Sequence, residues 1–142
     1  PEGADVLIPN DPTNRGRALI LLDKSGIIKL KDNQKLDSTI EDIAENPKKL
    51  KVTALNADQI PTRLGEVGAA VINGNFAMKN NLNPLTDSIF IEDKDSPYAN
   101  VITVLKGNEN DERIQKLVKA LQSEKIKKFI EEKYQGSVVP AF

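Results

Sequence analysis

The sequence predicts an α/β fold whose strands are mostly parallel. Short apolar runs typical of buried strands recur along the chain, helical segments separate them, and the last third has helical apolar spacing. Strands that alternate with helices are typical of a mostly parallel sheet. The 142 residues, with 39% hydrophobic and 29% charged, are enough for a folded core and do not have the composition of a disordered chain.

Six segments have the apolar character of strands. They are residues 5–9, 27–30, 51–55, 69–72, 88–91 and 101–105. Helices are predicted between and after them. Thr13 or Asn14 can cap a first helix that runs to about Ser25, and the apolar run 18–22 inside it implies burial on more than one side. The other predicted helices cover residues 38–45, a short segment that begins at 56 or 58, and two C-terminal segments capped by Asn110 and Ser123.

Both C-terminal helices are predicted to be amphipathic, because their apolar residues recur at helical spacing. The two apolar faces consist of Ile114, Leu117, Val118 and Leu121, and of Ile126, Phe129 and Ile130. Lysines lie mostly on the other sides of the second helix, where a solvated surface is the plainest interpretation.

The composition excludes several kinds of chemistry. The chain has no His and no Cys, so it has no Ser-His-Asp triad, thiol nucleophile, zinc finger or disulfide. With 20 Lys+Arg against 21 Asp+Glu, it lacks the basic excess that binding to nucleic acid or an anionic membrane requires. The longest apolar stretch is far shorter than the about 20 residues of a membrane helix. We predict no metal and no cofactor.

The first candidate site is the loop that joins the first strand to the first helix. In open α/β sheets, ligands bind at the carboxyl ends of strands, and a helix N-terminus suits an anion. Arg17 lies in the first turn of that helix and could form a forked contact with a carboxylate. Alternatively, the loop only caps the helix and Arg17 is exposed or pairs with Asp11. Gly16 stands alone, which argues against a dinucleotide or P-loop motif.

Two further loops contain polar candidates. Asn73 follows the run 69–72 and could hold an ammonium or a carboxylate through its amide, although capping of the next helix is the plainer interpretation. Residues 95–100 contain a Ser-Pro turn in which Tyr98 is predicted to pack for structural reasons. The acidic pair Glu92-Asp93 is interpreted as surface charge.

Together these segments resemble the NlpA-type lipoproteins, the methionine-binding receptors of bacterial ABC importers. The resemblance covers essentially the whole chain. It rests on residues 8–14 (IPNDPTN), 16–19 (GRAL), 42–43 (DI), 45–48 (ENPK), 70–73 (AVIN), 92–100 (EDKDSPYAN), 120–123 (ALQS) and 127–130 (KKFI).

The resemblance implies a two-lobed, type 2 periplasmic-binding-protein fold that closes on methionine. Residues 4–85 should form the second lobe, and residues 86–142 should cross the hinge and return to the first lobe. Most of the first lobe is expected to be missing, together with the lipidated Cys of the family and its aromatic and His contacts to the ligand. The full-length parent should be extracytoplasmic and lipid-anchored, with the anchor absent from this chain.

The resemblance also implies roles for particular residues. Arg17 is expected to bind the ligand carboxylate, and Asn73 and Asn100 the amino-acid backbone, with Tyr98 and Asn14 as further candidates. The expected partners are L-methionine or a close analogue and an importer permease. Nucleic acid is not an expected partner. A binding protein with these groups needs no acid–base catalyst, so no enzymatic activity is expected.

Two other interpretations remain open at this point. The chain could act only as a self-associating or antigenic surface fragment, because a first lobe without its main strands would leave sheet edges and apolar helix faces uncovered. An enzyme that uses Asp or Lys in the same cleft is a third interpretation.

Overall fold

The computed structural model describes residues 1–93, 97–134 and 136–142. These residues form two compact units, 1–92 and 93–142, which are described separately. Residues 95 and 96 of the third candidate loop lie outside the described residues.

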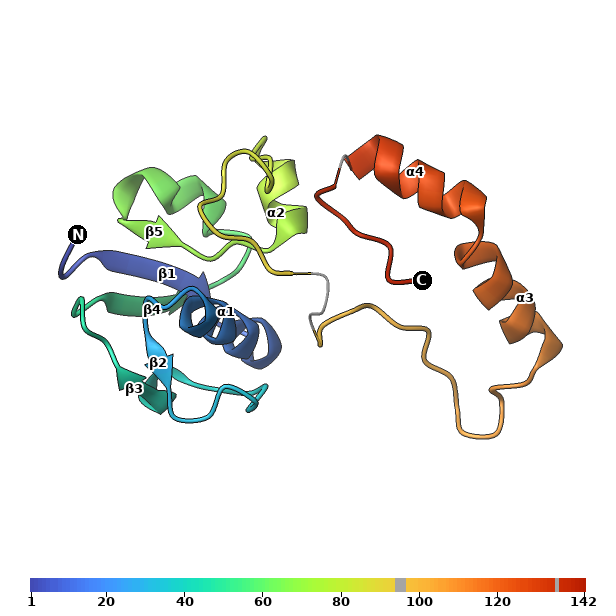
Figure 1. Cartoon of the computed structure of the whole chain (residues 1–142), viewed down its shortest axis with the longest axis horizontal. Helices are drawn as coiled ribbons and strands as arrows, with labels where there is room; N and C mark the ends of the chain where they lie inside the picture. Colours follow the sequence, from blue (N-terminus) through green and yellow to red (C-terminus); the bar gives the residue numbers. More distant parts are fainter. Residues whose placement is uncertain (94–96, 135) are drawn as a thin grey trace. The chain divides into compact units, whose positions relative to one another are not determined.

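The first unit is built on a three-stranded parallel sheet with β1 (Asp5–Pro9) at its centre. β4 (Lys51–Leu55) pairs with β1 along its whole length, from Asp5 opposite Lys51 to Pro9 opposite Leu55. On the other side, β5 (Ala69–Ala70) pairs with Val6 and Leu7 (Figure 1). The predicted α/β class is therefore confirmed, although β5 is shorter than the run 69–72.

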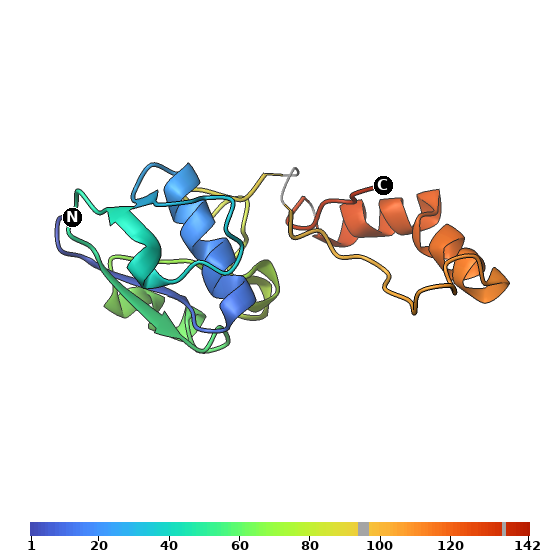
Figure 2. The same cartoon turned by 90° about the horizontal axis from the view of Figure 1, so that it is seen from below.

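The core lies between this sheet and α1 (Pro12–Lys24), which runs beside β1 in both views (Figures 1 and 2). The side chains of Ile8 and Leu19 are fully buried there. The core residues are Val6, Ile8, Ala18, Leu19, Ile20, Leu22, Ile28 and Leu30. As the run 18–22 predicted, α1 is buried over most of its circumference.

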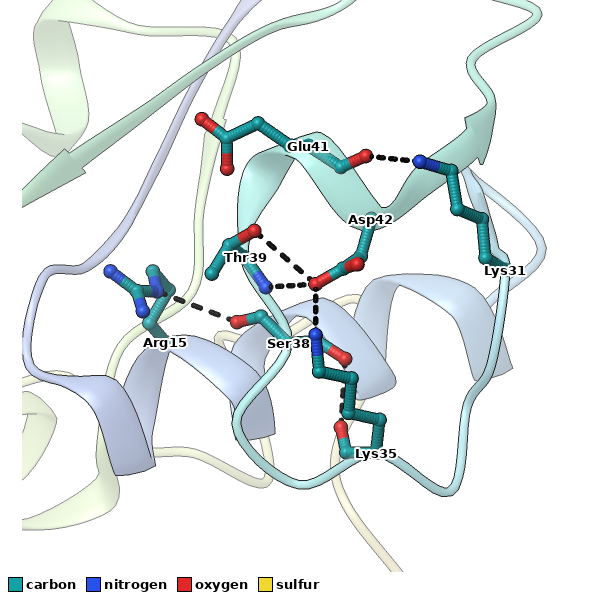
Figure 3. A network of polar contacts seen from close by, with 7 residues as sticks. All are labelled: Arg15, Lys31, Lys35, Ser38, Thr39, Glu41 and Asp42. Carbon is teal, nitrogen blue, oxygen red and sulfur yellow. Dashed lines mark hydrogen bonds and ion pairs between the residues drawn. The ribbon is translucent and has the colours of Figure 1, made fainter.

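The helix predicted over 38–45 is wrong. One 3-10 turn, η1 (Ile40–Asp42), is followed by strand β3 (Ile43–Glu45), which pairs antiparallel with β2 (Lys29–Leu30). A capping box closes the turn: the Asp42 carboxylate accepts the Thr39 backbone N–H (2.8 Å) and the Lys35 ammonium (2.9 Å), as Figure 3 shows. The chain then extends because β2 offers it a pairing partner.

Two short helical segments complete the first unit. The 3-10 helix η2 (Pro61–Glu66) begins at its proline rather than at the predicted residue 56 or 58. Proline suits the first helical position because its missing N–H is not needed there. α2 (Gly74–Lys79) follows Asn73.

The second unit contains α3 (Glu112–Leu121) and α4 (Glu124–Tyr134). Asp111, rather than the predicted Asn110, caps α3, because its carboxylate accepts the Arg113 backbone N–H at 2.9 Å. Ser123 precedes α4, as predicted, and its hydroxyl accepts the Ile126 N–H at 3.4 Å. The apolar faces of both helices are only half covered.

The strands predicted over 88–91, in the first unit, and 101–105, in the second, do not form within the described residues. Ile89 is 91% exposed and Val101 is 80% exposed, so neither segment packs its apolar side chains. A strand is stable only when a neighbouring strand satisfies its backbone groups, and the described part of the chain places none beside these two segments.

Candidate functional site

The carboxyl ends of the three parallel strands each lead into an asparagine. Asn10 follows β1, Asn56 follows β4, and Asn73 lies three residues after β5. Asn10 Nδ2 donates to Asn56 Oδ1 at 2.8 Å, which joins the ends of the two longer strands. Polar groups therefore gather at the edge of the sheet where ligands bind in open α/β folds.

Asp11, not Thr13 or Asn14, caps α1. Its carboxylate accepts the Asn14 backbone N–H at 2.9 Å, and Pro12 takes the first helical position. The Asn14 side-chain amide also donates to both Asp11 oxygens, at 3.2 Å and 3.1 Å. Because an ionised carboxylate only accepts hydrogen bonds, Asn14 must turn its NH₂ group toward Asp11 and its Oδ1 away from it.

The side chain of Asn73 contacts the Asn14 Oδ1 atom that faces away from Asp11. Asn73 occupies the N-cap position of α2, as the plainer interpretation predicts, but its side chain makes no capping hydrogen bond. Instead, Nδ2 donates to Asn14 Oδ1 at 2.8 Å. The contact joins two of the predicted site residues across the loops that follow β1 and β5.

The second polar atom of the Asn73 side chain has no hydrogen-bond partner among the described residues. Oδ1 is buried, and no group in the described residues donates to it. This orientation follows from a relay of hydrogen bonds. The Asp11 carboxylate orients the amide of Asn14, and Asn14 Oδ1 in turn orients the amide of Asn73. The last atom of the relay, Asn73 Oδ1, is an acceptor. A buried polar atom without a hydrogen bond costs about 1–3 kcal/mol, which a ligand that supplies a donor would recover.

Arg17 lies one helical turn after Asn14, on the same side of α1. Its guanidinium forms an ion pair with Glu92 rather than with Asp11. Nε donates to Glu92 Oε1 at 3.1 Å and to Oε2 at 2.8 Å, and Nη2 also donates to Oε2. The side chain of Arg17 is 37% exposed and that of Glu92 is 21% exposed.

Glu92 is a site contact that the sequence pattern did not predict, since the pair Glu92-Asp93 has the character of surface charge. Its contact with Arg17 joins residues 75 positions apart. The only sequence signal for this segment is the motif EDKDSPYAN at residues 92–100, which is part of the family resemblance.

Tyr98 and Asn100 belong to the second unit, where Tyr98 is half-buried and Asn100 is exposed. Asn14, Arg17 and Asn73 all lie in the first unit. The structure therefore brings Asn14 and Asn73 into contact, with Arg17 one turn away along α1, and the roles of Tyr98 and Asn100 stay predictions.

The described residues contain no cluster of three or more acidic side chains that could hold a metal ion. Within them, no helix has both the length and the apolar character needed to cross a bilayer.

Comparison with known proteins identifies the family. The profile of the NlpA lipoprotein family matches residues 1–142, so the chain belongs to that family and the resemblance in its motifs is confirmed. It is 45% identical over 138 residues to a probable D-methionine-binding lipoprotein MetQ of Haemophilus influenzae, covering 97% of this chain and 50% of the relative. It is 44% identical to the D-methionine-binding lipoprotein MetQ of Escherichia coli, covering 97% and 52%.

A solved structure agrees with these relatives. A nutrient-binding protein from Burkholderia cenocepacia, bound to methionine, matches with a TM-score of 0.90 and 48% identity, covering all of this chain and 60% of that protein. The substrate-binding-protein fold is therefore confirmed for this chain. The chain spans about half the length of the curated relatives it matches.

Proposed function

We propose that this chain contributes the Arg17 and Asn73 contacts of a receptor for methionine or a close analogue. The observation that carries the proposal is the buried Oδ1 of Asn73, an acceptor to which no group in the described residues donates. An α-ammonium group is a donor of the required kind. The guanidinium of Arg17, one turn away, suits the carboxylate of the same amino acid.

The comparisons support the choice of ligand. Two of the relatives are named as D-methionine-binding proteins, and the Burkholderia structure contains methionine. We propose L-methionine, D-methionine, its sulfoxide or a short methionyl peptide as ligands of the same backbone site. The activity is binding rather than catalysis, because a zwitterion can be held by opposite charges and oriented amides alone.

We further propose that this binding serves an ABC importer. Lipoprotein relatives support a location outside the cytoplasm, with a lipid anchor on the full-length protein. Closure of two lobes around the ligand would couple its capture to docking on the permease. On this proposal Asn100 and Tyr98 also contact the ligand, as the family resemblance implies.

Isothermal titration of L-methionine into this chain tests the site. Arg17→Ala and Asn73→Ala each remove one charge-assisted hydrogen-bonding group, worth about 1.5–3 kcal/mol, so each should weaken binding by about tenfold or more. Arg63→Ala is the matched control, because Arg63 lies in an exposed ion pair with Glu66. D-Methionine in the same titration compares the two enantiomers.

Two results would contradict the proposal. If the unmodified chain does not bind methionine, the proposed function is wrong for this chain. If both variants bind with unchanged affinity, the binding site does not include Arg17 and Asn73.

A second candidate function, self-association, is favoured by the half-exposed apolar side chains of α3 and α4. Leu117 is 46% exposed, Leu121 is 42% exposed and Phe129 is 50% exposed. Such faces are stabilised by burial against a second surface. Size-exclusion chromatography with light scattering separates the candidates: a monomer that binds methionine contradicts this one, and an oligomer that ignores methionine supports it.

A further inference from the structure

The carboxylate of Glu92 contacts the guanidinium of Arg17. This carboxylate accepts hydrogen bonds from Nε and from Nη2. The Glu92 side chain is 21% exposed, against 37% for that of Arg17. A forked contact of this kind is short and orients both partners. Any ligand carboxylate that approaches Arg17 therefore also approaches the negative charge of Glu92.

That juxtaposition has different consequences for different ligands. A carboxylic acid without an amine adds a second negative charge beside Glu92, and like charges that share a half-buried site repel each other. An amino acid brings an ammonium group with its carboxylate, and this positive charge offsets the repulsion. Specificity of this kind arises as much from disfavouring the wrong ligand as from attracting the right one.

We propose that Glu92 is a specificity-determining residue, which makes the site select amino acids with a protonated amine over carboxylic acids with the same side chain. The inference rests on the proposed function, because it takes Arg17 to be the ligand's carboxylate partner. Asn73 Oδ1 and Glu92 then have complementary roles. The amide oxygen accepts a hydrogen bond from the ligand's ammonium group, and the Glu92 carboxylate repels a ligand that lacks this group.

The test compares two ligands that differ only in the amine. L-Methionine and 4-(methylthio)butanoate have the same carboxylate and the same thioether chain. Both are titrated calorimetrically into the unmodified chain, into Glu92→Gln, which keeps the shape of the side chain and one acceptor oxygen, and into Glu66→Gln as the matched control. Glu66 also pairs with an arginine, through a single contact with Arg63 Nε at an exposed surface.

The quantity that decides is the ratio of the two dissociation constants, deaminated acid over methionine. In Glu92→Gln we expect this ratio to fall by about tenfold or more, mainly because the deaminated acid binds more tightly. Glu66→Gln should leave the ratio unchanged. Glu92→Ala removes the same charge by another route and should lower the ratio in the same direction, which covers the case in which the glutamine variant folds poorly.

The outcomes are separable. If Glu92→Gln and Glu92→Ala weaken both ligands by the same factor, Glu92 only orients Arg17 and the inference is overturned. If the unmodified chain binds methionine and Arg17→Ala does not weaken it, the assumption about Arg17 fails and the inference fails with it. If the unmodified chain binds neither ligand, the proposed function itself is contradicted.

Discussion

Asp11 governs the candidate site although it is not itself a predicted ligand contact. Its carboxylate fixes the amide of Asn14, which in turn fixes the amide of Asn73. An Asp in the N-cap position is usually interpreted as a helix-stabilising residue, worth about 1 kcal/mol. Here the same carboxylate also sets which atom of Asn73 is presented as an acceptor.

Arg17 and Asn73 could be selected from the sequence because each comes shortly after an apolar run that forms a strand. The position of a residue just after a predicted strand can be recognised from the neighbouring residues in a single sequence. Glu92 could not be selected in this way, because its importance depends on a contact with Arg17 across 75 positions. The pairing of Asn14 with Asn73 was likewise hidden by the distance between them in the chain.

Gly16 is a position at which no side chain fits. A β-carbon there would lie 1.9 Å from the Leu36 carbonyl oxygen and 3.2 Å from the Ser38 backbone nitrogen. The loop thus packs directly on the backbone of α1. We expect Gly16→Ala to lower the free energy of unfolding by about 1–3 kcal/mol, as overpacking does, although Ala is normally the better helix former.

Urea unfolding followed by circular dichroism measures this effect. Gly65→Ala is the control, because a β-carbon at that position meets nothing within 4 Å. A Gly16→Ala variant as stable as the unmodified chain would show that the loop can move away from the helix without cost.

Among the elements, β1 and α1 were the easiest to predict and the shortest segments the hardest. β1 is apolar from Val6 onward, and α1 carries an apolar run too long for a loop. The helix expected over 38–45 failed because its polar residues suit a helix start and a tight turn equally well. Pairing with β2, a tertiary contact, decided in favour of the turn followed by a strand.

The η1 turn makes the stability of its loop depend on pH. The Thr39 backbone N–H and, next, the Lys35 ammonium hold the pKa of the Asp42 carboxyl at about 2. Since this lies below the value of about 3.9 for an unfolded Asp, ionised Asp42 stabilises the folded state at neutral pH. That contribution is fully present above about pH 4 and is lost as the pH falls toward 2.

Asp42→Asn should therefore have a lower melting temperature than the unmodified chain at pH 7. We expect the difference to shrink as the pH falls from about 4 to about 2, because protonation then weakens the same contacts in the unmodified chain. Differential scanning calorimetry across this range measures it, with Asp58→Asn, at an exposed position, as the control. A difference that stays constant with pH would contradict the assignment.

The whole molecule consists of two units with very different burial. The core residues lie in residues 1–92, whereas α3 and α4 contain no fully buried residue within the described range. The sequence predicted the fold class, but it predicted strands at 88–91 and 101–105 from their apolar character alone. Apolar composition shows that a segment favours burial and does not show which surface buries it.

Hydrogen exchange should separate the two units. Backbone amides of β1 and β4 should exchange at least about 100-fold more slowly than those of residues 101–105, because β1 and β4 pair with each other and β1 is buried from Val6 onward. Exchange measured by mass spectrometry or NMR on the intact chain tests this. Equal protection of both segments would mean that 101–105 is paired in solution.

The order of strands in the sheet also bears on how the chain is made. β1 lies at the centre but precedes both of its neighbours in the sequence. A chain that becomes available from its N-terminal end therefore offers β1 and α1 to each other before Lys51–Leu55 is present to pair with β1. Until then, α1 is the only one of the three partners of β1 that can shield its Val-Leu-Ile run from water.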